Sequence, residues 1–237
     1  ASGDLGGTRW PNPQYVYNGG TLAIEYYNPV AGNSNTLGSV TSAAGPDITI
    51  TDDLATLHPN GFVLIKSATN GSSLCDPVNA SGGAWDWING TLAETFVANV
   101  RTAFGVMVRD MDWIPDLRGM FVALGDNDAF SEATGTLFAD RIASFVARLR
   151  RTFGTRTSGT NFPIAWRRPY GTGSTHLNQV ARATIRAAVD GMASVDSNFR
   201  PYSVDSLEMS PDGIHLSNEG QLHDGRLAVE AIAAGAI

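Results

Sequence analysis

Residues 119–128 read GMFVALGDND, a continuous apolar run that ends in a glycine followed by acids and an amide. A short apolar run of this kind is typical of a strand that is buried on both faces of a parallel sheet. In such sheets ligands bind beyond the carboxyl ends of the strands, which is where the polar residues fall. Three further runs have the same character, the last more weakly: residues 62–66, 162–166 and 202–205.

Helical periodicity fills the chain between and after these runs. Apolar residues recur every third or fourth position in residues 92–104, 137–153, 177–188 and 222–232, and Gly154 is a candidate C-cap. Strands that alternate with helices predict βαβ units and a parallel sheet. We therefore expect an α/β fold of three layers, with a doubly wound, mainly parallel sheet between two layers of helices. No repeat or linker divides the chain, so a single domain is expected over residues 1–237.

Charge and cysteine content exclude several classes of protein. With 16 Lys+Arg against 23 Asp+Glu the formal net charge is −7, and no basic stripe is present, so nucleic acid is not an expected partner. No apolar run approaches the length of a membrane span, so no membrane partner is expected either. A single cysteine, Cys75, forms no internal disulfide and is too few for a thiolate zinc site. Whether the chain is exported stays open.

One loop carries the strongest chemical signal. Asp212 and His215 lie three residues apart across a Pro-Asp-Gly turn. A carboxylate at that spacing can accept a hydrogen bond from Nδ1–H of the imidazole, which leaves Nε2 to act as a general base. The alternative, favoured on the spacing alone, is an Asx turn that caps the next helix and leaves His215 on the surface.

Two other loops offer hydrogen-bond donors for a developing oxyanion. Asn127 carries a side-chain amide, and Gly71 carries a backbone N–H that a substrate can approach closely. The structural alternatives are a turn with Asp128 or Ser131 as an N-cap, and a tight turn that needs positive φ at Gly71. Three tryptophans are candidates either for stacking on sugar rings or for the core: Trp85, Trp87 and Trp113.

A metal site on one helix is also conceivable but not expected. His215, Glu219 and His223 recur at every fourth position, yet they lack the His-Glu-x-x-His spacing of zinc helices. We interpret them as a solvated helix face and expect no metal.

Taken together, these loops resemble a known family. Residues 125–128 resemble the G-x-N-D block of SGNH hydrolases, and residues 212–217 resemble their D-x-x-H block. The finer resemblance is to the sialate O-acetylesterase-like branch, related to carbohydrate esterase family 6. That branch has a Gly-Pro-acid motif before the first helix (residues 45–47), a strand running into a Gly-Ser turn (residues 66–73) and a following Trp (Trp85). Its Q-G-E-(S/N)-D block corresponds here to residues 124–128, with Leu for Gln and Asp for Glu.

The resemblance spans residues 40–237 and implies a flavodoxin-like SGNH fold and an esterase. The substrate that the resemblance implies is an acetylated glycan or a small ester, from which the enzyme removes an acyl group, by the resemblance an acetyl group. In the implied mechanism a serine attacks the ester, His215 acts as general base and then acid, and Asp212 orients His215. Asn127 and the Gly71 N–H stabilise the oxyanion, and no metal or organic cofactor is involved.

The chain departs from the family at the nucleophile. The family's G-Q-S-N block, at the end of the first strand of the sheet, has no counterpart, and Ala1-Ser2-Gly3 resembles the residues that follow it. Ser2 is the nearest hydroxyl but lacks a preceding strand to form a strand-to-helix elbow. We expect an upstream segment or a partner chain to complete the sheet and supply the serine. The alternative is a catalytically inactive domain with a glycan-binding or structural role in a larger assembly.

Overall fold

The computed structural model describes residues 15–18, 24–28, 33–34, 45–58, 62–75, 81–88, 90–112, 114–154, 161–171, 177–213 and 215–234. Its helices and strands confirm the predicted α/β class. In chain order they are β1 (Tyr15–Asn18), β2 (Ile24–Asn28), β3 (Asn33–Ser34), α1 (Pro46–Leu57), β4 (Val63–Lys66), α2 (Leu92–Met111), β5 (Met120–Val122), the 3₁₀ helix η2 (Asn127–Phe130), α3 (Glu132–Phe153), β6 (Ile164–Arg167), α4 (Gln179–Val195), β7 (Phe199–Tyr202) and α5 (Asn218–Ala233).

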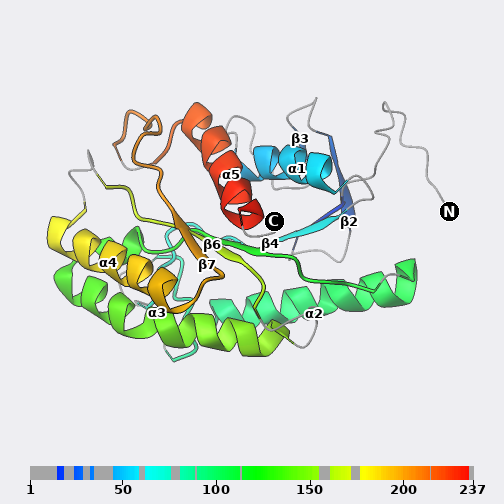
Figure 1. Ribbon diagram of the computed structural model, residues 1–237, viewed down its shortest axis with the longest axis horizontal. Helices are drawn as coiled ribbons and strands as arrows, with labels where there is room; N and C mark the ends of the chain where they lie inside the picture. The colour runs from blue at the N-terminus through cyan, green and yellow to red at the C-terminus, as the bar shows by residue number, and fades with distance from the viewer. Residues whose placement is uncertain are drawn as a thin grey trace.

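The elements form the three layers predicted from the sequence. Figure 1 shows α1 and α5 on one face of the strands and α2, α3 and α4 on the other. The larger core lies on the α2–α3–α4 side and contains Phe138, Ile164 and Trp166, each fully buried. The smaller core lies between α1 and α5 and contains Ile50 and Val229. None of the described helices is both long and apolar enough to cross a membrane.

Helices α1 and α5 pack closely because a glycine lies at their contact. A Cβ atom added to Gly225 would overlap Thr49 Oγ1 and the carbonyl oxygen of Pro46. The Thr49 hydroxyl instead donates to the carbonyl of Leu222 at 2.6 Å. The two helices are therefore joined by a hydrogen bond between them as well as by the smaller core.

Among the described residues the hydrogen bonding of the mainly parallel sheet is interrupted. The described strands form two sheets, in the orders β3-β2-β1-β4 and β5-β6-β7. Strand β1 pairs in parallel with β4. Strands β5, β6 and β7 pair in parallel with one another. Among the described residues no strand lies between β4 and β5, so hydrogen bonding stops at both.

Strands β4 and β5 nevertheless lie in the same layer. Leu64 of β4 and Phe121 of β5 pack on the smaller core, while Ile65 and Val122 pack on the larger one. All four residues of β4 are only partly buried, whereas the first three residues of β6 are buried completely. Interior strands of a doubly wound sheet are covered on both faces. We call the break in hydrogen bonding between these two strands the β4–β5 gap.

Three of the four predicted strands are confirmed, and the fourth is shifted. Strands β4, β5 and β6 fall inside or overlap the apolar runs at residues 62–66, 119–124 and 162–166, whereas β7 begins three residues before residue 202. The start of β7 was not predicted because residues 200 and 201 are an arginine and a proline, and a proline in a strand lacks the N–H of the ladder. Strand β7 tolerates Pro201 because it is the last strand of its sheet.

The four periodic segments are confirmed as α2, α3, α4 and α5. Gly154 does follow the last residue of α3, but its φ of −62° is right-handed. The predicted C-cap at Gly154 is therefore confirmed, in right-handed instead of left-handed geometry.

The β4–β5 gap predicts a contrast in amide exchange. The Met120 amide donates to Pro163 of the β6 side, so by the alternation of a parallel ladder the Phe121 amide points away from β6. In the 237-residue chain we expect Phe121 to exchange at least about 100-fold faster than Ile164, whose amide donates to Asn198 at 2.8 Å. Residue-resolved hydrogen exchange measures this. Equal protection of the two amides would show that the edge of β5 is paired.

Candidate active site

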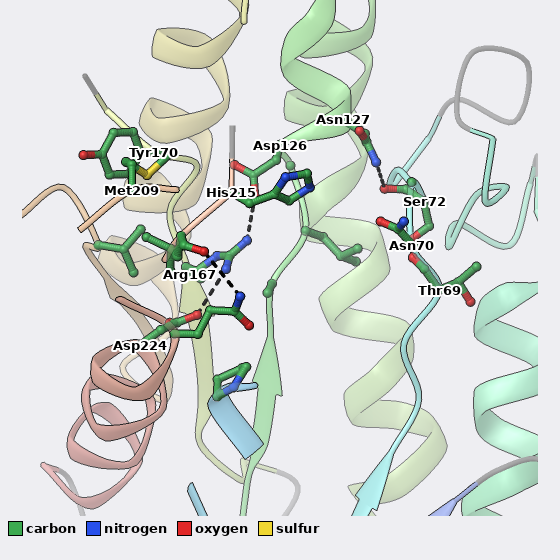
Figure 2. A pocket seen from close by; sticks show the side chains of 18 residues that line it. Thr69, Asn70, Ser72, Asp126, Asn127, Arg167, Tyr170, Met209, His215 and Asp224 are labelled. Carbon is green, nitrogen blue, oxygen red and sulfur yellow. Dashed lines mark hydrogen bonds and ion pairs between the residues drawn. The ribbon is translucent and has the colours of Figure 1, made fainter. Parts of the chain in front are cut away.

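A pocket opens at the carboxyl ends of β4, β5, β6 and β7 (Figure 2), and its volume is about 290 Å³. This is the position at which open parallel sheets bind ligands. It is lined by the loop after β4, the loop after β5, the end of β6, and the segment that leads into α5. Its lining residues include Gly71, Ser72, Asp126, Asn127, Arg167, Tyr170, His215 and Asp224.

The structure brings Asp212 and His215 into contact. Asp212 Oδ2 lies 2.7 Å from His215 Nδ1, and Asp212 Oδ1 accepts the backbone N–H of His215 at 3.0 Å. The turn between them contains Gly213 at a φ of 64°. A carboxylate so placed favours the tautomer with the proton on Nδ1, which leaves the Nε2 lone pair available. Among the described residues, no hydrogen-bond partner reaches Nε2.

The turn and the functional interpretation are therefore compatible in this loop. The same carboxylate makes an Asx turn through one oxygen and orients the imidazole through the other. The His215 side chain is 67% exposed and that of Asp212 is 44% exposed. His215 also lines the pocket, so a reacting group there would be accessible to its ring.

Asn127 and Gly71 line the same pocket from neighbouring loops. Asn127 Nδ2 donates to the carbonyl of Ser72 at 2.8 Å, so one of its two amide N–H bonds is engaged and the second can serve a ligand. Gly71 has a φ of 69°, as expected for a tight turn, and a Cβ there would overlap Ser81 Oγ. No described residue accepts a hydrogen bond from its N–H.

Asp128, which the sequence suggested only as a possible N-cap, joins the two loops that bear these donors. Its side chain is fully buried, and its carboxylate accepts the backbone N–H groups of Leu74 at 2.8 Å and Cys75 at 3.1 Å. The N-cap of α3 is instead Ser131, whose hydroxyl accepts from the Thr134 N–H. The position of Asn127 relative to Gly71 therefore depends on Asp128.

The tryptophans described by the structure belong to the core. Trp85 is 8% exposed and donates from Nε1 to Ser72 Oγ at 2.9 Å, which supports the Gly71–Ser72 turn. Trp87 packs on Phe145 and is covered by the Arg148 guanidinium. Trp113 and the candidate nucleophile Ser2 lie outside the described residues.

The Gly-Pro-acid motif begins α1 instead of preceding it. Gly45 is the N-cap and Pro46 is the first helical residue, where a missing N–H costs nothing. Asp47 forms an ion pair of 3.0 Å with Lys66 at the end of β4. This pair fixes the start of α1 beside the pocket, which Pro46 lines.

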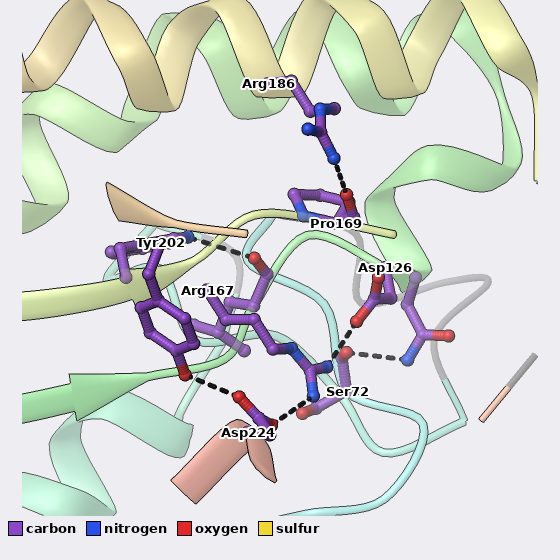
Figure 3. Close-up of polar contacts among 10 residues, drawn as sticks. Ser72, Asp126, Arg167, Pro169, Arg186, Tyr202 and Asp224 are labelled. Carbon is purple, nitrogen blue, oxygen red and sulfur yellow. Dashed lines mark hydrogen bonds and ion pairs between the residues drawn. The ribbon is translucent and has the colours of Figure 1, made fainter. Parts of the chain in front are cut away.

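A cluster of charged side chains that the sequence did not predict also lines the pocket. Arg167, the last residue of β6, contacts Asp126 Oδ2 through Nη2 at 2.6 Å and Asp224 Oδ2 through Nη1 at 3.1 Å (Figure 3). Asp224 also accepts from the Tyr202 hydroxyl at 2.9 Å. The available signal was an arginine directly after the buried run Ile164–Trp166, but its partners come from distant loops.

The electrostatics keep this cluster in one charge state. Burial lowers the pKa of Arg167, but the carboxylates of Asp126 and Asp224 more than offset it, so the pKa is raised overall. Burial, together with the charge of Asp224, raises the pKa of Tyr202 well above its usual value. Arg167 is therefore a cation and Tyr202 a neutral donor at physiological pH.

A second arginine–aspartate pair supports the loop that carries Tyr170. Arg186 donates to both carboxylate oxygens of Asp205, at 2.9 and 2.6 Å, and to the carbonyl of Pro169 at 2.7 Å. Asp205 also accepts the Gly171 N–H at 2.5 Å. Burial raises the pKa of Asp205, but these hydrogen bonds outweigh it, and the pKa is lowered overall.

The described residues contain no group of three His, Cys, Asp or Glu side chains placed to hold a metal ion. In the helix face considered above, Glu219 lies 3.4 Å from His223 Nε2 and forms a solvated pair with it.

Comparison with known proteins shows a likeness of fold. The sequence matches no protein-family model and no curated protein. A crystal structure of a protein from Arabidopsis thaliana aligns with a TM-score of 0.70 at 15% identity, covering 94% of this chain and 81% of that chain. At this identity the likeness establishes a shared fold.

Two bacterial proteins align with lower scores. One is a carbohydrate acetylesterase family member from Sinorhizobium meliloti, with a TM-score of 0.47 at 15% identity over 94% of this chain and 98% of that chain. The other, from Agrobacterium tumefaciens strain C58, is provisionally named an arylesterase, with a TM-score of 0.47 at 12% identity over 95% of this chain and 99% of that chain.

Replacing the buried carboxylate should loosen the site. We expect Asp128→Asn to lower the free energy of unfolding by about 2–4 kcal/mol, because the amide can accept from only one side and presents a donor to a buried N–H. Urea denaturation measures the change. Asp140→Asn, the same substitution at an exposed position of α3, is the control. A loss below about 0.5 kcal/mol would contradict the role given to Asp128.

Asp205 should make stability depend on pH in the acid range. Because its folded pKa is lowered, it stabilises the protein above its unfolded pKa of about 3.9, and that stability is lost as pH falls through the folded pKa. Its side chain is 35% exposed, so we discount for solvent screening and expect Asp205→Asn to cost about 1 kcal/mol at pH 7. The difference from the wild type should be smaller at pH 3, where part of this stability is lost. Denaturation at both pH values measures it, and an equal cost at both would contradict the assignment.

Proposed function

We propose that the protein is a carboxylic ester hydrolase, an O-acetylesterase that acts on acetylated carbohydrate. The observation that carries the proposal is the contact of His215 Nδ1 with Asp212 Oδ2 at 2.7 Å, at the rim of the pocket that Asn127 and Gly71 also line. A base with an orienting carboxylate and two oxyanion donors are the groups that acyl transfer needs. The resemblance to the sialate O-acetylesterase-like branch supports the choice of substrate.

In the proposed mechanism His215 carries the proton in both halves of the reaction. Nε2 takes the proton of a serine hydroxyl as its oxygen bonds to the ester carbonyl carbon, and the tetrahedral oxyanion accepts from Gly71 N–H and the second N–H of Asn127. His215 then protonates the alcohol that leaves, forming an acyl-enzyme. Water attacks this intermediate by the same route and releases the acid. Asp212 stays ionised and stabilises the imidazolium.

We propose that a strand filling the β4–β5 gap supplies the serine. Gly71 lies in the loop after β4 and Asn127 follows β5, so a parallel strand between β4 and β5 would end between the two oxyanion donors. A serine at its carboxyl end would meet the carbonyl of an ester held there. We propose that this strand comes from a segment outside the described residues or from a partner chain.

Three hydroxyl side chains line the pocket among the described residues, those of Thr69, Ser72 and Tyr170, and none of them bonds to His215. Two of the three are engaged in other hydrogen bonds. Ser72 Oγ donates to the Thr69 carbonyl at 2.7 Å and accepts from Trp85, so its hydroxyl supports the turn. The Tyr170 hydroxyl donates to the Leu207 carbonyl at 3.5 Å. Because none of these hydroxyls bonds to His215, a second candidate function is a glycan-binding domain without catalysis.

Covalent labelling separates the two functions. A fluorophosphonate probe should label one serine, and peptide mapping should place it in the segment that fills the β4–β5 gap. His215→Ala should abolish the labelling and lower kcat for an aryl acetate by about a thousandfold or more, because no other group replaces the base.

His223→Ala is the matched control, because His223 is exposed on α5 and pairs only with Glu219 among the described residues. The His223→Ala variant should react with the fluorophosphonate probe and hydrolyse the aryl acetate as the wild type does. A folded wild-type protein that neither labels nor hydrolyses aryl acetates, with or without the completing strand, would exclude the esterase and favour the binding domain.

A further inference from the structure

The pocket carries a net negative charge on one side. Its charged lining residues are Asp126, Arg167 and Asp224, apart from His215, among the residues that the structure describes. Arg167 is contacted from two sides by the two carboxylates, at 2.6 and 3.1 Å. One cation between two anions leaves the cluster with one negative charge. No second Lys or Arg among the described lining residues compensates for it.

The two carboxylates of this cluster are not equivalent. The Asp224 side chain is 3% exposed, and its two oxygens accept from Tyr202 and Arg167. The Asp126 side chain is 39% exposed, and only Oδ2 accepts from Arg167. No donor from a described residue reaches Asp126 Oδ1. Arg167, itself anchored on buried Asp224, thus holds an accessible carboxylate at a fixed place in the pocket.

Asp126 lies on the side of the pocket that the alcohol part of a substrate would occupy. It directly precedes Asn127, so it is next to the proposed oxyanion position. Figure 2 shows Thr69, Asn70 and Ser72 on one side of the pocket and Arg167, Tyr170 and Asp224 on the other. With the acyl group held between Gly71 and Asn127, the β6 side remains for the rest of the substrate.

A fixed carboxylate distinguishes ligands by charge. It accepts short, charge-assisted hydrogen bonds from hydroxyl groups. It also repels a ligand carboxylate, and the repulsion is strong where water is partly excluded. Arg167 cannot relieve this repulsion, because both of its contacts are already with carboxylates.

We propose that Asp126, held by Arg167, binds hydroxyl groups of the substrate alcohol and makes the pocket select uncharged sugars over sugars that carry a carboxylate. The assignment of the alcohol side rests on the proposed function. The inference favours neutral acetylated glycans over acidic ones such as acetylated sialic or uronic acids. Asp126 is then a specificity-determining residue, and Arg167 is the residue that positions it.

Binding of two matched sugars tests the proposal without requiring catalysis. The probes are the methyl glycosides of N-acetylglucosamine and N-acetylmuramic acid. They share an acetamide and a sugar ring and differ at O3, where the muramic acid carries a lactyl ether with a carboxylate in place of a hydroxyl. Titration into the 237-residue chain, followed by NMR, should show at least tenfold tighter binding of the neutral sugar. Asp126→Asn should weaken binding of the neutral sugar about tenfold. It should also reduce the ratio between the affinities for the neutral and the acidic sugar.

Asp190→Asn is the control, because Asp190 pairs with Arg168 on the surface and does not line the pocket. It should leave both affinities unchanged. Raising the salt concentration should narrow the wild-type preference, since ions screen the repulsion. The salt dependence is measured on the wild type alone, so the proposal can still be tested if Asp126→Asn does not fold.

Three results would overturn the inference: equal or tighter binding of the muramic acid glycoside, binding of neither sugar, or unchanged neutral-sugar affinity in folded Asp126→Asn. Hydrolysis of an aryl acetate, measured on the same samples, tests the proposed function separately. Selective sugar binding without hydrolysis, even when the completing strand is supplied, would exclude the esterase and keep the role of Asp126. Hydrolysis without a preference for the neutral sugar would keep the esterase and exclude the proposed role of Asp126.

Discussion

The buried carboxylate of Asp128 is the interaction on which the candidate site depends. It accepts two backbone N–H groups of the loop after β4 while it belongs to the loop after β5. A charge buried this completely is stable only when it is hydrogen bonded, so the two loops have one favourable relative position. Gly71 and Asn127 take their places from this contact, and Asn127 reinforces it by donating to Ser72.

Arginine–carboxylate pairs extend the same principle across the rest of the pocket. Arg167 ties the end of β6 to the loop after β5 and to α5, while Arg186 ties α4 to the loops after β6 and β7 through Asp205. Each guanidinium offers several donors in a fixed plane and so can fix more than one segment. The pocket is therefore held by polar contacts between loops, and the apolar cores hold the layers beneath it.

The β4–β5 gap sets a physical limit on how the chain can act. Both bordering strands carry apolar side chains into the two cores, yet their facing edges lack a described partner. Backbone groups in the middle of a sheet are costly to leave unpaired. A strand that fills the gap would relieve this cost and would end between Gly71 and Asn127. In the proposed function, the strand that completes the sheet therefore also supplies the catalytic serine.

The sequence by itself determined the α/β class, three strands, four helices and the contact of Asp212 with His215, because these depend on local periodicity or on a three-residue turn. The shift of β7 was not predictable, since Pro201 hides a strand whose edge position only the sheet reveals. The hydrogen bonds of Asp128 to the loop after β4 and the ion pairs of Arg167 depend on tertiary structure alone. Arg167 meets Asp126 and Asp224 across 41 and 57 residues of chain, and no local pattern encodes a pairing of that length.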